Sequence, residues 1–339
     1  MATNARRIVL ARRPVGEPTP DDFRLEEHPI PQPQDGEALV RTLWLSLDPY
    51  MRGRMTDAPS YARPIHIGEV MEGRAVGEVV ESRDASLKPG DKVFGITGWQ
   101  THAAVAARHL RKLDPALAPI STALGVLGMP GLTAYTGLLE IGKPQPGETV
   151  VVAAASGAVG SLVGQIAKIK GARAVGIAGG LRKCAYVKEE LGFDDCIDHR
   201  APDFAARLKA ACPNGIDVYF ENVGGAVFEA ALPLLNEFAR VPVCGLIAHY
   251  NATELPPGPN KVPQVMRAIL TKRLTFRGFI VADFAARLDD FLRDVSGWLR
   301  AGKVKYREDV VEGLENAPRA LIGLLRGENF GKLVVRVAS

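Results

Sequence analysis

The stretch that decides the fold is Thr149-Val-Val-Val-Ala-Ala-Ala-Ser-Gly-Ala-Val-Gly160. Its first five residues are apolar and mostly β-branched, which predicts a buried strand that ends at Ala153. Apolar residues at 159, 162, 163, 166 and 167 then predict an amphipathic helix that ends at Gly171. A strand, a turn of small residues and a helix in this order are typical of the first unit of a doubly wound parallel sheet.

The turn itself predicts a binding site for a dinucleotide. Its residues Gly157, Ala158, Val159 and Gly160 follow an A-x-x-G-x-x-G spacing, and glycine lets a pyrophosphate approach the backbone closely. The amide groups and the dipole at a helix N-terminus favour such an anion. On this motif alone, a turn of small residues that only packs tightly remains an alternative.

The next predicted strand, from Ala174 to Ala178, indicates which dinucleotide is bound. Sites for NAD place an Asp or Glu near the end of this strand to bind the ribose 2′-hydroxyl. Here the strand runs into Gly-Gly-Leu-Arg-Lys183, where no acid stands and where Lys183, with Arg182 beside it, would attract a 2′-phosphate. We therefore expect NADP(H), that is NADPH and NADP+, against the alternative that these cations are a solvated helix start.

Outward from this turn, the chain divides into two kinds of sequence. Residues 130–302 alternate strand-like and helical segments and predict a Rossmann cofactor domain with an α/β fold. Residues 1–129 contain short strands broken by Pro and Gly, and with residues 303–339 they are expected to form a β-barrel-like domain. The predicted strands are Glu37 to Leu45, Ala75 to Ser82, Lys92 to Ile96, Thr101 to Ala106, Thr149 to Ala153, Ala174 to Ala178, Asp217 to Glu221, Ala239 to Leu246, Leu274 to Val281 and Lys332 to Val337, with a further segment Val304 to Val311 and a helix Ala317 to Arg326.

Composition narrows the function classes. The chain has 339 residues, 47% of them hydrophobic, and a net charge of +4 with scattered basic residues, which gives little reason to expect a nucleic-acid partner. The sequence contains no signal peptide pattern and no membrane-spanning stretch, so a cytoplasmic protein is expected. The four cysteines form no CxxC pair and are expected to be reduced packing residues: Cys184, Cys196, Cys212 and Cys244.

Five motifs in order resemble a known family over nearly the whole chain. They are Asp48-Pro-Tyr-Met-Arg-Gly-Arg-Met55, Gly128-Met-Pro-Gly-Leu-Thr-Ala-Tyr135, Gly157-Ala-Val-Gly160, Tyr219-Phe-Glu-Asn-Val-Gly-Gly225 and Gly327-Glu-Asn-Phe-Gly-Lys332. The sequence is similar to the zinc-independent medium-chain dehydrogenases/reductases of the leukotriene B4 dehydrogenase, prostaglandin reductase and alkenal reductase group, especially to bacterial NADPH-dependent curcumin reductases. The resemblance implies a GroES-like catalytic domain formed by both chain ends, a Rossmann domain between them and a site in the cleft.

The resemblance also assigns roles to single residues. It implies that Lys183 and His199 contact the 2′-phosphate, although the second position is often Tyr in the family. It implies that Tyr50 lines the substrate pocket and that Tyr250 polarises the substrate. The remaining implied cofactor contacts are Asn222, Cys244, Gly245, Leu246, Ile247, Tyr250, Phe279, Ile280, Val281 and Asn329. For Phe279, a place in the core is an alternative.

No metal is expected. The related zinc alcohol dehydrogenases need Cys or His ligands, and the N-terminal part of this chain contains no cysteine. His28, His66, His102 and His109 show no ligand-like spacing. Chemistry without a Lewis acid is therefore the expectation.

The implied reaction is NADPH-dependent reduction of the carbon–carbon double bond of an enone or enal. Hydride reaches the β-carbon while charge builds on the carbonyl oxygen, so a hydroxyl donor is needed, and Tyr250 is the predicted one. One alternative is that Tyr250 only packs against the cofactor. Others are that the protein is a quinone oxidoreductase, that it is a secondary-alcohol or 15-hydroxy dehydrogenase, or that it binds the cofactor without turnover. A homodimer is expected, paired through the strand-like run Leu274 to Val281.

Overall fold

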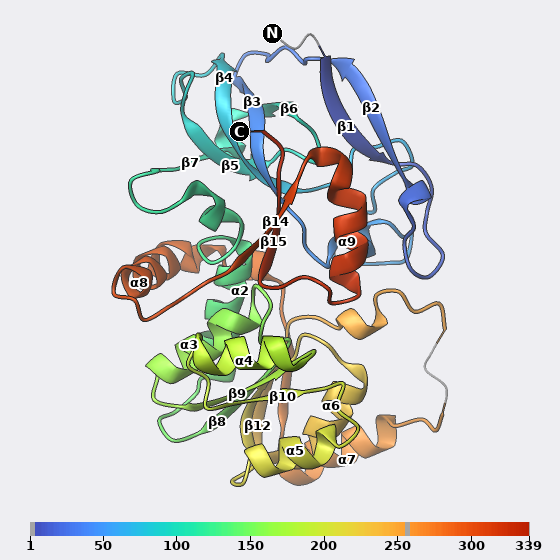
Figure 1. Cartoon of the computed structure of the whole chain (residues 1–339), viewed down its shortest axis with the longest axis vertical. Helices are drawn as coiled ribbons and strands as arrows, with labels where there is room; N and C mark the ends of the chain where they lie inside the picture. Colours follow the sequence, from blue (N-terminus) through green and yellow to red (C-terminus); the bar gives the residue numbers. More distant parts are fainter. Residues whose placement is uncertain (1–3, 255–257, 339) are drawn as a thin grey trace. The chain divides into compact units, whose positions relative to one another are not determined.

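The computed structural model describes residues 4–254 and 258–338. The chain divides into two compact units, which we call unit 1 (1–125 with 308–339) and unit 2 (126–307). Unit 1 is rich in strands, and unit 2 alternates strands with helices (Figure 1). The fold class predicted from the sequence, a β-rich domain combined with a Rossmann domain, is confirmed.

Unit 2 is built on a parallel sheet whose first strand lies in its middle. The six strands run in the order β10-β9-β8-β11-β12-β13, so the chain adds strands on one side of β8 and then returns to the other side. The order reverses between β8 and β11, and such a switch point is where open α/β sheets bind ligands. The strands are β8 (Thr149–Ala153), β9 (Arg173–Ala178), β10 (Asp195–Asp198), β11 (Ile216–Phe220), β12 (Leu235–Val243) and β13 (Thr275–Gly278).

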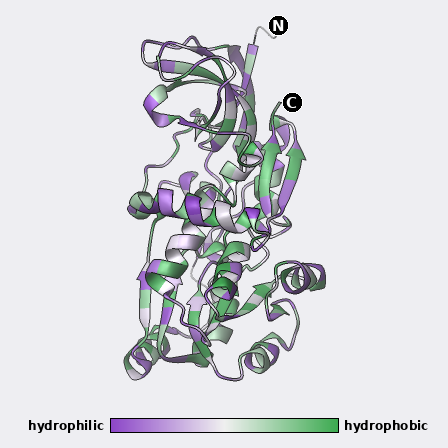
Figure 2. Cartoon of the chain, turned by 90° about the vertical axis from the view of Figure 1, so that its left-hand side faces the viewer, coloured by the Kyte–Doolittle hydropathy of each residue, from purple (hydrophilic) through white to green (hydrophobic). Residues whose placement is uncertain are grey.

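Helices cover both faces of this sheet because alternate strand residues point to opposite faces. Val151, Ile177 and Tyr219 belong to a buried cluster with residues of α5, α6 and α7, while α3 and α4 pack on the other face. In Figure 2 the helices are banded with hydrophobic and hydrophilic residues, as amphipathic helices are. The helices of unit 2 are α2 (Met129–Thr136), α3 (Gly160–Ile169), α4 (Leu181–Glu189), α5 (Phe204–Ala211), α6 (Gly225–Ala231), α7 (Val262–Lys272) and α8 (Leu288–Arg300).

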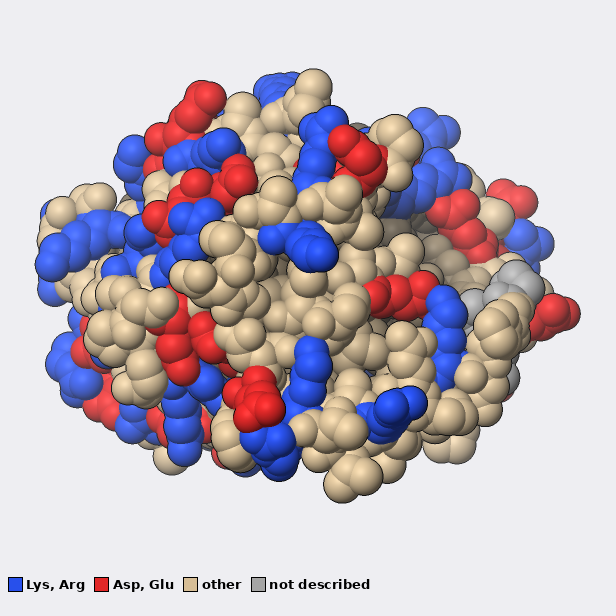
Figure 3. Space-filling view, turned by 90° about the horizontal axis from the view of Figure 1, so that it is seen from below, with Lys and Arg blue, Asp and Glu red and all other residues tan. Residues whose placement is uncertain are grey.

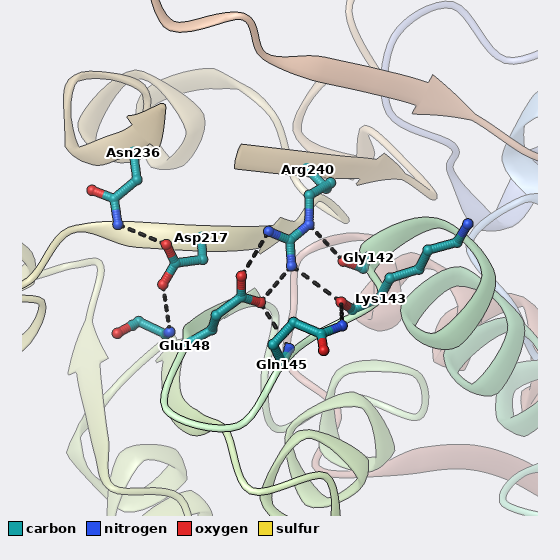
Figure 4. A network of polar contacts seen from close by, with 8 residues as sticks. Gly142, Lys143, Gln145, Glu148, Asp217, Asn236 and Arg240 are labelled. Atoms are coloured by element: carbon teal, nitrogen blue, oxygen red, sulfur yellow. Dashed lines mark hydrogen bonds and ion pairs between the residues drawn. The ribbon is translucent and has the colours of Figure 1, made fainter. Parts of the chain in front are cut away.

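A network of polar contacts links the strands at the end of the sheet where β8 begins (Figure 4). Arg240 of β12 forms a two-point ion pair with Glu148, which precedes β8, and donates to the carbonyl of Gly142 at 2.8 Å. Asp217 of β11 accepts a bond from the Thr149 amide at 2.8 Å. Bidentate pairs of this kind fix geometry as well as adding energy. They therefore hold the sheet at the amino end of β8, while the loops with the predicted site residues follow the carboxyl ends of the strands.

Unit 1 contains a seven-stranded sheet and a separate two-stranded one. The larger sheet has the order β14-β15-β3-β4-β5-β7, and β6 pairs with β3. Strands from the two ends of the chain therefore share one sheet, because β15 pairs antiparallel with β3. The elements are β1 (Asn4–Leu10), β2 (Phe23–Pro29), β3 (Glu37–Ser46), α1 (Met51–Arg54), β4 (Arg74–Ser82), β5 (Lys92–Ile96), β6 (His102–Ala106), β7 (Arg111–Lys112), β14 (Glu308–Glu312), α9 (Ala317–Leu325) and β15 (Lys332–Arg336).

Some elements differ from the sequence-based prediction. The strand predicted for Ala239 to Leu246 begins earlier, at Leu235, and ends at Val243. The run Leu274 to Val281 contains only a four-residue strand, although it does lie at the edge of the sheet, as predicted. The tail segment Val304 to Val311 forms a strand only from Glu308. Strands β1, β2, β7 and β10 were not predicted. Strand β10 is four residues long with acids at both ends, so it carries little hydrophobic signal.

Candidate functional site

The turn after β8 is tightly folded around the carbonyl of Ala154. Ala154 has a left-handed φ of 54°, and the amide of Gly157 donates to its carbonyl at 3.0 Å. A Cβ placed on Gly160 would stand 2.3 Å from that oxygen, so no larger residue fits there without a shift. A Cβ on Gly157 would stand at 3.2 Å from the same atom. Gly160 therefore lets the start of α3 pack closely on the turn, which is one role of the glycines in a dinucleotide-binding turn, and residues 157–159 are half-buried beside it.

The side chain of Asn222 links the loop after β11 to the end of β8, at the point where the strand order reverses. Its side-chain amide donates to the carbonyl of Ala153, the last residue of β8, at 2.8 Å. The preceding Glu221 is buried, and its Oε1 accepts bonds from the amides of Val223 at 2.6 Å and Gly224 at 2.8 Å. These contacts fix the loop after β11, so the predicted residue Asn222 lies beside the predicted turn.

The loop after β12 is bonded to the loop after β11. The amide of Cys244 donates to the Glu221 carbonyl at 2.9 Å, and the amide of Ala248 donates to the Val223 carbonyl at 3.0 Å. Gly224 has a φ of 76°, and a Cβ on it would meet His249 at 3.1 Å. The residues predicted from Cys244 to Tyr250 are therefore brought to the carboxyl end of the sheet by main-chain bonds.

The Tyr250 hydroxyl folds back over its own loop. It accepts a bond from the Leu246 amide at 3.4 Å, and a Cβ on Gly245 would stand 3.1 Å from it. The ring is half-buried. A phenol hydroxyl is both a donor and an acceptor, so this group is of the kind that can donate a hydrogen bond to a carbonyl oxygen.

The thiol of Cys244 is held in its neutral form. Burial raises the pKa of its thiol to about 12, and the Glu221 carboxyl nearby adds to the effect. The thiolate is the reactive form of cysteine. At neutral pH Cys244 is a neutral packing residue.

The side chain of Phe279 points into the core. It is buried, it makes edge-to-face contacts with Phe220 and Phe284 at 6.4 and 6.0 Å between ring centroids, and it packs against Gly137. Ile280 and Val281 follow β13 and are half-buried. A cofactor contact from this segment would therefore come from the main chain around Phe279.

The end of β9 brings together the residues predicted for the 2′-phosphate. Lys183 lies in the first turn of α4, and the amide of His199, which follows β10, donates to the Ala178 carbonyl at 3.1 Å. A Cβ on Gly179 would stand 3.0 Å from His199 Nε2 and 3.1 Å from Arg200 Nε. Arg200 was not predicted from the sequence, although it directly follows His199.

Tyr50 belongs to unit 1 and lies in a cluster of charged side chains. Its hydroxyl accepts a bond from Arg74 at 3.0 Å and donates to Glu72 at 3.3 Å. The guanidinium groups of Arg54 and Arg74 each lie 5.7 Å from the centre of its ring. Burial and the nearby Asp48 raise the pKa of the Tyr50 hydroxyl, so it stays protonated.

Asn329, also in unit 1, lies in the loop before β15. Its side-chain amide donates to the carbonyl of Gly331 at 2.8 Å, and the amide of Phe330 donates to Asp309 at 2.9 Å. Asn329 is half-buried. The loop is thus held by one polar contact within itself and by one to β14.

Within residues 4–254 and 258–338, no group of three or more His, Cys, Asp and Glu side chains could hold a metal ion. In the same ranges no helix is both long and apolar enough to span a membrane. On the face shown in Figure 3, basic and acidic side chains are interspersed.

Comparisons with known proteins identify the family. Residues 6–113 match a family described as the N-terminal domain of oxidoreductase, and residues 158–296 match one described as zinc-binding dehydrogenase. The NADPH-dependent curcumin reductase of Escherichia coli is 56% identical, over 98% of this chain and 97% of that protein. The NADP(+)-dependent 2-alkenal reductase of Nicotiana tabacum is 40% identical, over 98% of this chain and 97% of that protein.

A solved structure shows the same likeness. The crystal structure of CurA from Vibrio vulnificus in complex with NADPH has a TM-score of 0.96 and 55% identity, and the match covers 98% of this chain and 99% of that one. The similarity in sequence and the similarity in fold therefore both extend over almost the full length of the chain. This chain belongs to the medium-chain dehydrogenase/reductase family.

Proposed function

We propose that this protein is an NADPH-dependent reductase of the carbon–carbon double bond in α,β-unsaturated ketones and aldehydes. The observation that carries the proposal is the position of Tyr250: its loop is bonded to the end of β11, beside the switch point of the sheet. The reductases of Escherichia coli and Nicotiana tabacum, whose names state NADPH- or NADP(+)-dependent reduction, support it.

The residues of unit 2 fit NADPH. The turn from Gly157 to Gly160 would hold the pyrophosphate, since Gly157, Ala158 and Val159 are half-buried and lie at the start of α3. Lys183 and His199 would hold the 2′-phosphate. Residues 177–183, at and after the end of β9, include no Asp or Glu that would repel it. The nicotinamide would lie against Asn222 and the main chain of the segments 244–247 and 279–281. Asn329 of unit 1 remains a predicted contact.

Bound NADPH supplies a hydride to the β-carbon of the substrate. Tyr250 would donate a hydrogen bond to the carbonyl oxygen, where negative charge builds as the enolate forms. The α-carbon then takes a proton from Tyr250 or from solvent, which leaves the saturated carbonyl product. Tyr50, with its protonated hydroxyl, is the proposed residue of the substrate pocket in unit 1.

The test is oxidation of NADPH by a panel of an enal, an enone, a quinone and a simple ketone, followed through the absorbance of the reduced nicotinamide. The same assays with NADH and with a metal chelator complete it. Consumption that depends on the enone, favours NADPH and ignores the chelator supports the proposal. Activity confined to the quinone or to the ketone would replace it with the corresponding alternative.

We also propose that the protein is a cytoplasmic homodimer. Strand β13 is the last strand of the described six-stranded sheet, and its outer edge could pair with a second copy. All four cysteines are free thiols, which suits a reducing compartment. Light scattering on the purified protein tests the dimer, and a monomer mass across the concentration range would contradict it.

A further inference from the structure

The turn that follows β9 is bordered by cations from two elements. Arg200 Nε and Cζ would lie 3.1 and 3.3 Å from a Cβ on Gly179, and His199 Nε2 would lie 3.0 Å from it. Lys183 approaches from α4 and acts electrostatically on His199. A Cβ on Gly180, by contrast, would meet nothing within 4 Å, so this side of the turn is open.

Asp198 links the turn after β9 to the segment after β10 by accepting bonds from a main-chain amide of each. Its Oδ1 accepts bonds from the amide of Gly180 at 2.8 Å and from that of Arg200 at 3.0 Å. Burial would raise the pKa of Asp198, but these two bonds hold it below the ordinary value, so the carboxylate is charged. The two cations Lys183 and Arg200 outnumber this one carboxylate, so the opening has a net positive charge.

His199 is sensitive to what occupies this opening. Loss of hydration lowers its pKa, and so do Arg200 and Lys183, while Asp198 acts in the opposite direction. Without an anion the imidazole is therefore neutral at neutral pH, and it adds no charge. A doubly charged phosphate beside it would favour the imidazolium form.

We propose that Arg200 and His199 together set the preference for a dinucleotide that carries a 2′-phosphate, with His199 taking up a proton when the phosphate binds. Arg200 supplies a permanent charge and His199 a charge that the ligand itself induces. This inference deepens the proposed function, because it rests on a dinucleotide being bound at the turn after β8.

The proton uptake has a definite direction with pH. The complex holds one more proton than its separated components between the pKa of free His199 and its higher pKa in the complex. Affinity for the 2′-phosphate therefore falls as pH rises through this window. Below about pH 6 the phosphate itself becomes protonated, which works against binding.

The test uses the nucleotide fragments 2′,5′-ADP and 5′-ADP, which need no substrate and no turnover. Their binding to the full chain is measured by isothermal titration calorimetry near neutral pH, in buffers of different ionisation enthalpy, so that proton uptake is counted. For Arg200→Ala we expect 2′,5′-ADP to bind about tenfold or more weakly, as loss of a charge-assisted bond implies, with 5′-ADP unchanged. For His199→Phe we expect the proton uptake to disappear.

Lys209→Ala is the matched control, since Lys209 is an exposed cation of α5 in the same unit, and it should change neither quantity. The proposal fails if Arg200→Ala weakens both fragments equally or neither, or if proton uptake is absent in the unaltered protein or survives in His199→Phe. Failure of the enone assay with intact fragment binding would instead reject the proposed reaction and keep this site.

Discussion

Lys332 Nζ lies 2.8 Å from Asp48 Oδ1, and the two side chains are only 5% and 6% exposed. The same ammonium group donates to the carbonyl of Leu47 at 2.7 Å, and the Ser46 hydroxyl donates to the other oxygen of Asp48 at 2.5 Å. The pair joins the first and the last of the five motifs found in the sequence. It therefore fixes the segment that carries Tyr50 to strand β15 inside unit 1.

Lys332→Met should strongly destabilise the protein. Removing one partner leaves a buried carboxylate without compensation, which costs about 3–5 kcal/mol of unfolding free energy. Urea unfolding followed by circular dichroism measures the loss. The double variant Lys332→Met/Asp48→Asn should recover part of it, since no buried charge is then left alone. A single variant that unfolds within about 1 kcal/mol of the parent would show the pair to be solvated.

Gly160→Ala should weaken both folding and NADPH binding. The added Cβ would stand 2.3 Å from the Ala154 carbonyl, so the turn after β8 must shift, at a cost of about 1–3 kcal/mol. Gly297→Ala in α8 is the matched control, because its Cβ meets nothing within 4 Å and alanine favours helices by about 1 kcal/mol. Urea unfolding and fluorescence titration with NADPH measure the two effects. Unchanged NADPH affinity in Gly160→Ala would remove this turn from the cofactor site.

Tyr250→Phe should lower turnover and leave cofactor binding almost unchanged. The bond that the hydroxyl accepts from the Leu246 amide is long, at 3.4 Å, so the loss of this bond disturbs the loop little. Removing a donor to a developing oxyanion costs about 3 kcal/mol, or roughly a hundredfold in kcat. Steady-state kinetics with an enone checks this, with Tyr306→Phe in the same unit as control. If kcat is retained, the tyrosine only packs in its loop.

Local sequence signals predicted the centre of unit 2 well. The strand Thr149 to Ala153 has its predicted bounds, because it is apolar throughout and ends at a glycine-containing turn. Strand β12 was misplaced, because its first residues include Asn236, Glu237 and the exposed Phe238, which look like a loop. A strand that mixes exposed polar residues with buried ones has no simple periodicity.

The site itself depends on contacts between residues distant in sequence. Asn222 lies in one of the five motifs and the resemblance assigns Tyr250, but nothing local shows that the amide of Cys244 reaches the carbonyl of Glu221. Arg200 was missed for a similar reason: it follows an unpredicted strand, and only the pairing of β10 with β9 brings it over Gly179. Local patterns thus predict apolar strands such as β8, while the position of a loop residue such as Arg200 depends on how the strands pair.

Glu221 gives a prediction about pH. Burial raises the pKa of its carboxyl, and the bonds from the Val223 and Gly224 amides oppose this only in part. The folded protein therefore binds this proton more tightly than the unfolded chain does. Stability from this group is present below the unfolded pKa of about 4.3 and is lost as pH rises through the folded value.

Glu221→Gln should remove this loss, because the amide oxygen can still accept both main-chain bonds and carries no charge to desolvate. We expect the variant to gain unfolding free energy relative to the parent as the pH is raised from 5 to 8, at up to about 1.4 kcal/mol for each unit by which the folded pKa is raised. Urea unfolding at a series of pH values measures the difference. Parallel pH profiles for the two proteins would show that the Glu221 carboxyl titrates normally, and that the loop after β11 is held by its main-chain bonds alone.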